Sequence, residues 1–390
     1  MPEAQPATVM KIGLVTDCYV PRLGGIEMQV HDLGQRLREA GHEVVVVTPT
    51  PGPDVVDGVP VHRMDVPLAP FDIPYKPSSF DRVIELLEAE AVDVAHFHGG
   101  IVSPLAFVSA HHAVQRRIPT VITTHCLWSY ATPVFRLLER RYRWSEWDAV
   151  FSAVSEVAAA PIRRIAPNRE VLILPNGIDN RAWEIDPSPR DPDRVVIVSV
   201  MRLAPRKRPL QLLKMFKRVR QRVPSNIDLR LVIIGEGPER KSMERYVAAQ
   251  GLSDAVELTG RLSREQIREV YATADIFVAP ANLESFGIAA LEARCAGLPV
   301  VAKARTGIRE FVDHGQEGLL ADSDADMVDQ LVTLVLDREL RGKITARNRE
   351  IPSPVDWTEV VSLNLDAYQK ARELVGASAV GPPRSRIAQR

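Results

Sequence analysis

Two glutamates at the ends of a small apolar segment are the first residues of this chain that suggest chemistry. Residues 284–292 read ESFGIAALE, with Gly287 near the middle. A strand-like run precedes the segment and a helical pattern begins close to Gly287. The backbone N–H groups of Phe286, Gly287 and Ile288 are therefore expected among the free donors of a first helical turn. Such donors can bind hydroxyl or phosphate oxygens, with Glu284 and Glu292 beside them.

Both carboxylates also have an ordinary structural interpretation. Glu284 would then be a loop acid aligned with a helix dipole, and Glu292 would be a surface residue. Against this, small or apolar residues surround Glu292 in the sequence, and a carboxylate in such surroundings needs a partner.

Adjacent glycines form a second candidate site. Gly24 and Gly25 follow the apolar run at 11–17 and stand directly before a helical pattern at 27–41. Glycines let backbone N–H groups approach a ligand closely, and a helix N-terminus favours an anion, so the pair predicts a phosphate cradle. The alternative is a tight loop without a ligand.

A basic cluster and two histidines also follow strand-like runs. Arg202 and Lys207 come after the run at 194–200 and suit a diphosphate, while the neighbouring Arg206 and Arg208 fit either a ligand site or a solvated surface. His98 and His125 each end a strand-like run, which is more often structural than catalytic for one histidine but less so for two.

The pair Asp324 and Asp326 imitates a D-x-D metal motif. It stands at a predicted helix start, however, where aspartates cap free N–H groups. We therefore predict no metal site and no cofactor.

These candidates are positioned by strands and helices that alternate along the chain. The near-continuous apolar strands predict an α/β fold with parallel sheets covered by helices, and the pattern restarts after a Pro- and Asp-rich link at 179–194. Two doubly wound domains facing a central cleft follow from this, with ligands at the carboxyl ends of the strands.

The composition limits the function classes. A formal net charge of −1 gives no global field that would favour nucleic acid, and three scattered cysteines argue against a disulfide framework. The start shows no signal-peptide pattern and no apolar run reaches bilayer length, so a cytoplasmic protein is expected.

Taken together, these motifs resemble the retaining glycosyltransferases of family four, which have the GT-B architecture of two Rossmann-like domains. The resemblance covers about residues 10–375 and includes enzymes that glycosylate inositol phospholipids. The matching segments are GG at 24–25, TTH at 123–125, LPNGID at 174–179, RLAPRK at 202–207, GEGPER at 235–240 and ESFGIAALE at 284–292.

The resemblance implies an N-terminal acceptor domain at 10–183, a C-terminal donor domain at 190–355 and a helix at 356–376 that crosses back to the first domain. Residues 1–9 and 377–390 are expected to be mobile ends.

The resemblance also implies a role for each candidate. Arg202 and Lys207 would grip the donor diphosphate, with Gly24 and Gly25 closing over it. Glu292 would bind the donor ribose and His125 would lie near the transferred sugar. The donor sugar would be contacted by Glu284 and by the amides of Phe286, Gly287 and Ile288. The resemblance gives His98 the role of an acceptor or accessory residue.

Two departures from the family pattern stand near the donor motif. Met201 replaces a more usual small residue, and Arg208 follows Lys207 where glycine is common. Both could narrow the donor site or reshape its loop, but neither removes a charged ligand.

The function implied is retaining transfer of a hexose, foremost mannose from GDP-mannose, to a lipid-linked or carbohydrate acceptor. The alternatives are a UDP-dependent N-acetylglucosamine or glucose transferase, another GT-B enzyme such as a sugar-nucleotide epimerase, and a non-catalytic nucleotide-binding scaffold. A basic aromatic segment at 132–147 would place the enzyme on the inner membrane surface, or would be a helix with its apolar side packed inward.

Overall fold

The computed structural model describes residues 9–22, 24–66, 68–69, 73–74, 76–128, 132–186, 191 and 193–380. The chain forms two compact units: unit 1 comprises Met1–Pro175 with Trp357–Arg390, and unit 2 comprises Asn176–Asp356. Residues 1–8 and 381–390, within the ends predicted to be mobile, lie outside the described residues.

Unit 1 is built on an eight-stranded sheet. Its strands are β1 (Lys11–Thr16), β2 (Glu43–Thr48), β3 (Val55–Val56), β4 (Val59–Arg63), β7 (Val94–Gly99), β8 (Thr120–Thr124), β9 (Val150–Ala153) and β10 (Val171–Ile173). Their order is β10-β9-β8-β7-β1-β2-β4-β3, and all pairs are parallel except β3 with β4. Outside this sheet, β5 (Leu68–Ala69) pairs with β6 (Ile73–Pro74).

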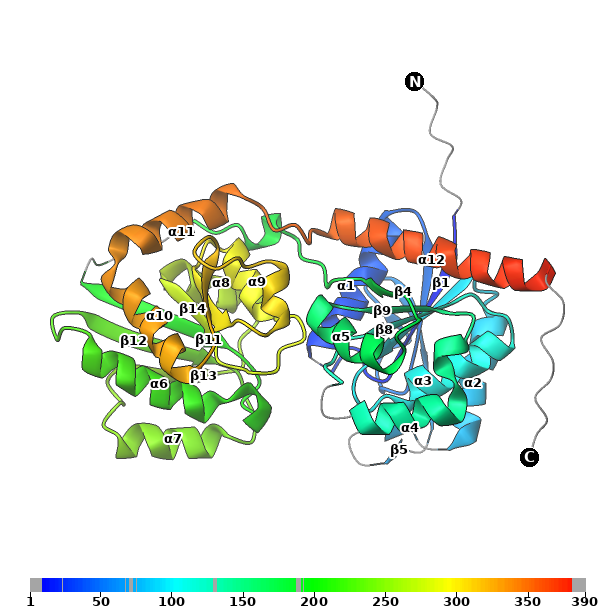
Figure 1. The fold of residues 1–390 in the computed structure, drawn as a ribbon, viewed down its shortest axis with the longest axis horizontal. Coiled ribbons are helices and arrows are strands. Elements are labelled where there is room, and N and C mark those ends of the chain that lie inside the picture. The colour runs from blue at the N-terminus through cyan, green and yellow to red at the C-terminus, as the bar shows by residue number, and fades with distance from the viewer. Residues whose placement is uncertain are drawn as a thin grey trace, which may run out of the picture. The chain divides into compact units, whose positions relative to one another are not determined.

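Helices cover both faces of this sheet, as its buried apolar strands require. They are α1 (Gly25–Glu39), α2 (Pro77–Ala89), α3 (Pro104–Gln115), α4 (Thr132–Tyr142), α5 (Glu156–Ile165) and α12 (Trp357–Val380), with a short turn η1 (Trp144–Glu146). α12 lies on one face of the sheet, and α2 and α3 lie on the other (Figure 1).

Helix α12 continues to Val380, past the end predicted at residue 376. The extension is physically reasonable because Ala377 favours a helix and the sequence Gly381-Pro382-Pro383 cannot continue one. Residues 377–380 therefore belong to the helix rather than to a mobile end.

Unit 2 has a six-stranded parallel sheet in the order β13-β12-β11-β14-β15-β16. The strands are β11 (Arg194–Val200), β12 (Asp228–Ile234), β13 (Val256–Gly260), β14 (Ile276–Ala279), β15 (Val300–Lys303) and β16 (Gly318–Ala321). Its helices are α6 (Pro209–Arg222), α7 (Arg240–Ala249), α8 (Arg264–Thr273), α9 (Ile288–Cys295), α10 (Asp324–Leu336) and α11 (Arg338–Glu350), with short turns η2 (Arg181–Trp183), η3 (Pro205–Lys207) and η4 (Gly307–Glu310).

The core of unit 2 lies between its central strands and α6 and α10. Leu212, Phe216 and Val219 of α6 are buried against the strand residues Ile197 and Leu231. Apolar residues spaced by three or four positions place one stripe of the helix on the sheet. The predicted α/β architecture with two parallel sheets is confirmed, and the predicted strand at 194–200 coincides with β11.

Among the helices that the structure describes, none combines the length and apolar character needed to cross a bilayer.

Candidate active site

The carboxyl ends of the unit 2 strands bring together two charged residues far apart in sequence. Lys207 ends the turn η3 after β11, and Glu284 lies in the loop between β14 and α9. The Lys207 ammonium donates to Oε2 of Glu284 in an ion pair. The two side chains remain 22% and 16% exposed, so a ligand can reach both charges. Ligands of such sheets bind at this edge.

The loop that carries Arg202 and Lys207 is held by the neighbouring glycine-rich loop. Met201 N donates to Ile234 O at 3.0 Å, and Leu203 N donates to Glu236 O at 2.8 Å. Gly235 has a φ of +137°, and a Cβ there would lie 1.9 Å from Met201 O. Glycine is therefore required at 235 for the two loops to approach this closely.

Within this loop, Arg202 and Met201 point to different environments. Arg202 is exposed, and its guanidinium makes no hydrogen bond or ion pair with any residue that the structure describes. Met201 is half-buried and packs against the hydrophobic core of unit 2. Its side chain is thus part of the core packing, which argues against the prediction that it narrows the donor site.

The start of α9 carries the free N–H groups predicted from ESFGIAALE. Gly287 precedes the helix with φ 95° and ψ 54°, and the N–H groups of Phe286, Gly287 and Ile288 have no acceptor within the described part of the chain. Phe286 is buried and fixes this turn against Phe311, with ring centroids 5.4 Å apart. The unpaired donors are consequently held on a rigid turn.

Glu292 lies half-buried on α9, close to Tyr271. Burial raises the pKa of Tyr271 well above its usual range, and the charge of Glu292 adds to this shift. The Tyr271 hydroxyl donates to Ala289 O at 3.2 Å, which ties α8 to α9. The position of Glu292 agrees with a carboxylate in partly apolar surroundings rather than on an open surface.

In unit 1, the ends of β7 and β8 bring His98 and His125 into contact. Nδ1 of His98 lies 3.0 Å from Nε2 of His125, and both side chains are buried. Burial lowers the pKa of His98 well below its usual range, assisted by the neighbouring His96 and His125, so its imidazole is neutral. Nε2 of His98 has no partner among the described residues. A buried N–H without an acceptor is costly, so the proton belongs on Nδ1, which donates to His125.

Hydrogen bonds of the neighbouring His96 help to hold this histidine pair in place. Nδ1 of His96 lies 2.9 Å from the Tyr368 hydroxyl of α12, and Nε2 of His96 lies 2.6 Å from Oγ1 of Thr123. The imidazole rings of His96 and His98 are 3.9 Å apart between centroids. The C-terminal helix therefore contributes directly to the order of this edge.

The glycine pair at the start of α1 is accompanied by an acid that sequence patterns did not single out. Gly24 is extended, and a Cβ there would lie 2.3 Å from Oε2 of Glu27. Glu27 is 7% exposed and pairs with Arg22, with Nε and Oε1 3.1 Å apart. Gly24 thus makes room for an Arg22–Glu27 ion pair at the helix start. The sequence could have predicted this ion pair only if Gly24 and the acid in the first turn of α1 were considered together.

Asp17, at the end of β1, is a second acid missed from the sequence. Its Oδ1 accepts a hydrogen bond from Leu105 N at the start of α3, at 3.3 Å. Burial raises its pKa to about 7. No sequence signal distinguishes this aspartate from a solvated one, because its burial results from α3 packing over the strand end.

Comparison with known proteins identifies the family. Residues 23–181 match Glycosyltransferase Family 4, and residues 181–351 match Glycosyl transferases group 1. The chain belongs to these GT-B glycosyltransferases. As a glycosyltransferase, it moves a sugar from a nucleotide-sugar donor.

Two curated relatives carry related names. The chain is 24% identical over 366 residues to the phosphatidylinositol N-acetylglucosaminyltransferase gpi3 subunit of Schizosaccharomyces pombe, covering 91% of this chain and 79% of the relative. It is 29% identical over 311 residues to one subunit of the phosphatidylinositol N-acetylglucosaminyltransferase of Homo sapiens, covering 77% of this chain and 63% of that protein.

A solved structure shares the fold. The glycosyltransferase has a TM-score of 0.70 to Anabaena Alr3699/HepE in complex with UDP, at 19% identity, covering 92% of this chain and 100% of that one.

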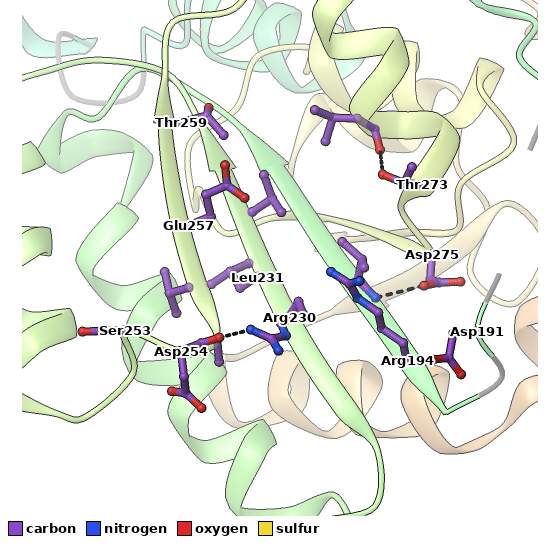
Figure 2. A pocket seen from close by; sticks show the side chains of 15 residues that line it. Asp191, Arg194, Arg230, Leu231, Ser253, Asp254, Glu257, Thr259, Thr273 and Asp275 are labelled. Carbon is purple, nitrogen blue, oxygen red and sulfur yellow. Dashed lines mark hydrogen bonds between the residues drawn. The ribbon is translucent and has the colours of Figure 1, made fainter. Parts of the chain in front are cut away.

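One pocket of the glycosyltransferase lies away from these residues. A cavity of about 650 Å³ opens over the face of β12 and β13 toward the amino ends of the strands (Figure 2). Its rim is charged, with Arg230 donating to Asp254 O and Oδ2 of Asp275 accepting from Val196 N at 2.9 Å. None of the predicted donor-site residues lines it.

Helix α4 of the glycosyltransferase, within the predicted segment 132–147, leaves most of its apolar side chains exposed. Within this described helix, Phe135 is the one buried residue, and it stacks on Trp128 with ring centroids 3.6 Å apart. Val134, Leu137 and Tyr142 are 58%, 66% and 48% exposed. The alternative in which the segment packs its apolar side inward therefore holds for Phe135, whereas Val134, Leu137 and Tyr142 remain exposed.

Proposed function

We propose that this glycosyltransferase transfers N-acetylglucosamine from a UDP donor to an inositol phospholipid, with retention at the sugar carbon. The two relatives named above belong to phosphatidylinositol N-acetylglucosaminyltransferases, and the similar HepE structure holds UDP. These names favour the UDP-sugar alternative over GDP-mannose, which was the first expectation from the sequence.

The observation that carries the proposal is the ion pair of Lys207 with Glu284 beside the unpaired amides of residues 286–288 at the start of α9. Without a donor, the two charges neutralise each other. A bound nucleotide sugar would give Lys207 a phosphate and Glu284 a sugar hydroxyl. Each charged group would then exchange one polar partner for another, which limits the desolvation cost of binding.

Each remaining residue has a proposed part in this chemistry. Negative charge develops on the leaving diphosphate, and the cations Arg202 and Lys207 together with the amides of 286–288 would stabilise it. Glu292 would accept hydrogen bonds from the ribose. Front-face attack, in which the leaving phosphate helps to deprotonate the acceptor, requires no protein nucleophile, so Glu284 acts by binding.

Unit 1 would bind the acceptor, and some of its residues would also contact the donor. His125 would contact the transferred sugar, with His98 orienting its ring. Gly24 and Gly25 would admit a phosphate group next to Arg22, whose charge is shared with Glu27.

The test is a ligand screen of the purified protein by thermal shift and isothermal titration against UDP-N-acetylglucosamine, UDP-glucose, GDP-mannose and ADP-glucose. Tightest binding of UDP-N-acetylglucosamine, and its transfer to phosphatidylinositol in detergent micelles, is the expected result. Binding of GDP-mannose alone would overturn the choice of donor. Anomeric analysis of the product by NMR tests retention.

We also propose that α4 docks on the membrane that carries the lipid acceptor. Its exposed apolar side chains at 134, 137, 138 and 142 recur at helical spacing, and arginines stand at 136, 140 and 141, with Arg143 directly after the helix. An amphipathic basic helix of this kind binds anionic lipid surfaces.

Sedimentation with vesicles of phosphatidylcholine and phosphatidylserine tests this docking. The Leu137→Ser variant should bind more weakly. Exchange of Leu336, an apolar residue of α10 that is 48% exposed, for serine serves as the control. Equal sedimentation of both variants and the wild type would contradict the role of α4.

A further inference from the structure

Arg208 stands in a backbone conformation that normally selects glycine. Its φ is 61° and its ψ is 43°, in the left-handed region, where the chain passes from the turn η3 into α6. A non-glycine residue is disfavoured in this region. The resemblance to family four implies glycine at this position, and this chain has a long cationic side chain there instead. Such a substitution persists when the side chain makes compensating contacts.

The side chain of Arg208 makes those contacts across the carboxyl edge of the sheet. Its Nη1 donates to Pro280 O at 3.2 Å and to Oδ1 of Asn282 at 2.8 Å. Nη1 and Nη2 also form a bidentate pair with the Asp324 carboxylate, at 2.8 and 2.6 Å. The guanidinium therefore links the loop after β11 to the loop after β14 and to the first residue of α10.

Asp324 completes this cluster. It also accepts from Nζ of Lys303 at 2.8 Å and from Nε2 of Gln211 at 3.0 Å. The cations Arg208 and Lys303 hold the pKa of Asp324 well below its usual range. The carboxylate that imitates a metal ligand in the sequence anchors two basic side chains.

The cluster stands two residues from the donor-site acid. Asn282 and Glu284 belong to the same loop, and Lys207 directly precedes Arg208. The left-handed turn at Arg208 sends its side chain to Asn282 while that of Lys207 reaches Glu284. Two adjacent basic residues thus clamp one loop at two points.

We propose that Arg208 is a positioning residue that fixes the loop 280–284, so that Glu284 stands beside Lys207 where the donor sugar binds. This inference rests on the proposed function for the donor site. The arginine at position 208 would thus order the part of the donor site that binds the sugar. In this role Arg208 acts through its contacts with Asn282 and Asp324 and not as a ligand of the sugar or the phosphates.

The test compares Arg208→Gly with Arg206→Ala. Glycine suits the backbone at 208, so the first variant should remain folded while it loses the clamp. Arg206 is an exposed residue of the same turn, so the second variant removes the same charge without touching the cluster. Asp324→Asn, alone and combined with Arg208→Gly, completes a double-mutant cycle.

The first measurement is affinity for UDP and for UDP-N-acetylglucosamine by titration calorimetry. In Arg208→Gly the affinity for the nucleotide sugar should fall by about tenfold relative to that for UDP, because a displacement of about 1 Å at a site can cost up to 10²-fold. Arg206→Ala should either leave the affinities for UDP and UDP-N-acetylglucosamine unchanged or lower both by the same factor. A general loss of structure would also weaken both alike. If Arg208→Gly behaves in that way, the proposal is wrong.

The second measurement needs no ligand. Hydrogen–deuterium exchange of peptides covering 280–288 should be faster in Arg208→Gly and Asp324→Asn than in the wild type and Arg206→Ala. Unchanged exchange would overturn the positioning role. If the wild type binds neither ligand, the proposed donor fails by itself, and the exchange experiment still decides whether Arg208 orders the loop.

Discussion

Replacing Gly287 by alanine tests the geometry of the α9 start most directly. Gly287 has a φ of +95°, and a Cβ at this position would lie 2.6 Å from Cγ1 of Ile308. The left-handed backbone costs alanine about 1–2 kcal/mol, and the overlap with a buried side chain adds about 1–3 kcal/mol. We therefore expect Gly287→Ala to lower the free energy of unfolding of unit 2 by about 2–5 kcal/mol.

Two other glycines of unit 2 separate these contributions. Gly251 has a φ of +62° with no atom within 4 Å of an added Cβ, so Gly251→Ala should cost only the backbone contribution of about 1–2 kcal/mol. Gly342 lies within α11 with open space around it. Gly342→Ala should therefore stabilise the unit by about 0.5–1 kcal/mol.

Thermal and urea unfolding of the three variants measure these differences. The midpoint temperature should shift by about 2–4 °C for each kcal/mol in a unit of this size. Equal losses in Gly287→Ala and Gly251→Ala would show that Ile308 yields without cost. A Gly287→Ala variant as stable as the wild type would refute the whole argument for a rigid turn.

Three further predictions follow from the other acids and from the histidine pair. Glu292→Ala should weaken binding of UDP-N-acetylglucosamine by about tenfold, the equivalent of about 1.4 kcal/mol, in titration calorimetry, and unchanged affinity would return Glu292 to a structural role. Burial raises the pKa of Asp17 to about 7. Between about pH 4 and 7 the native state therefore keeps a proton on Asp17 that the unfolded state has lost. The free energy of unfolding should consequently fall as the pH rises through this range, by up to about 1.4 kcal/mol per pH unit. Asp17→Asn should remove that slope in urea titrations, and an identical slope would contradict the burial argument. His98→Leu should change the ¹⁵N tautomer signals of His125 and lower kcat. His98→Asn keeps an N–H donor near the place of Nδ1 and should preserve both the signals and kcat. Identical spectra in the wild type and the two variants would exclude an orienting role for His98.

The local elements follow closely from the sequence. The predicted strand at 194–200 matches β11, and the predicted helix at 209–223 ends one residue earlier, as α6. Strand and helix periodicities are local properties of the chain, and buried parallel strands read as continuous apolar runs. The glycines of ESFGIAALE and GEGPER are local too, because each fixes the backbone at its own position.

The other features of the site depend on contacts between residues that are far apart in the sequence. The Lys207–Glu284 pair joins residues 77 positions apart, and the Arg208–Asp324 pair joins residues 116 positions apart. The sequence left Arg208 open between ligand site and surface, and it could not show that Met201 faces the core. The exposure of most apolar side chains of α4 likewise depended on where Trp128 and Phe135 pack.

The sequence by itself determined which segments become strands and helices, where the chain turns sharply and which family motifs it carries. These follow from the backbone preferences and apolar spacing of neighbouring residues. Only the tertiary structure decided which charges meet, because an ion pair between distant loops depends on strand order and on the register of the sheet that carries both. Burial of Asp17 and His98 is of the same kind, since the environment of a side chain is supplied by elements elsewhere in the chain.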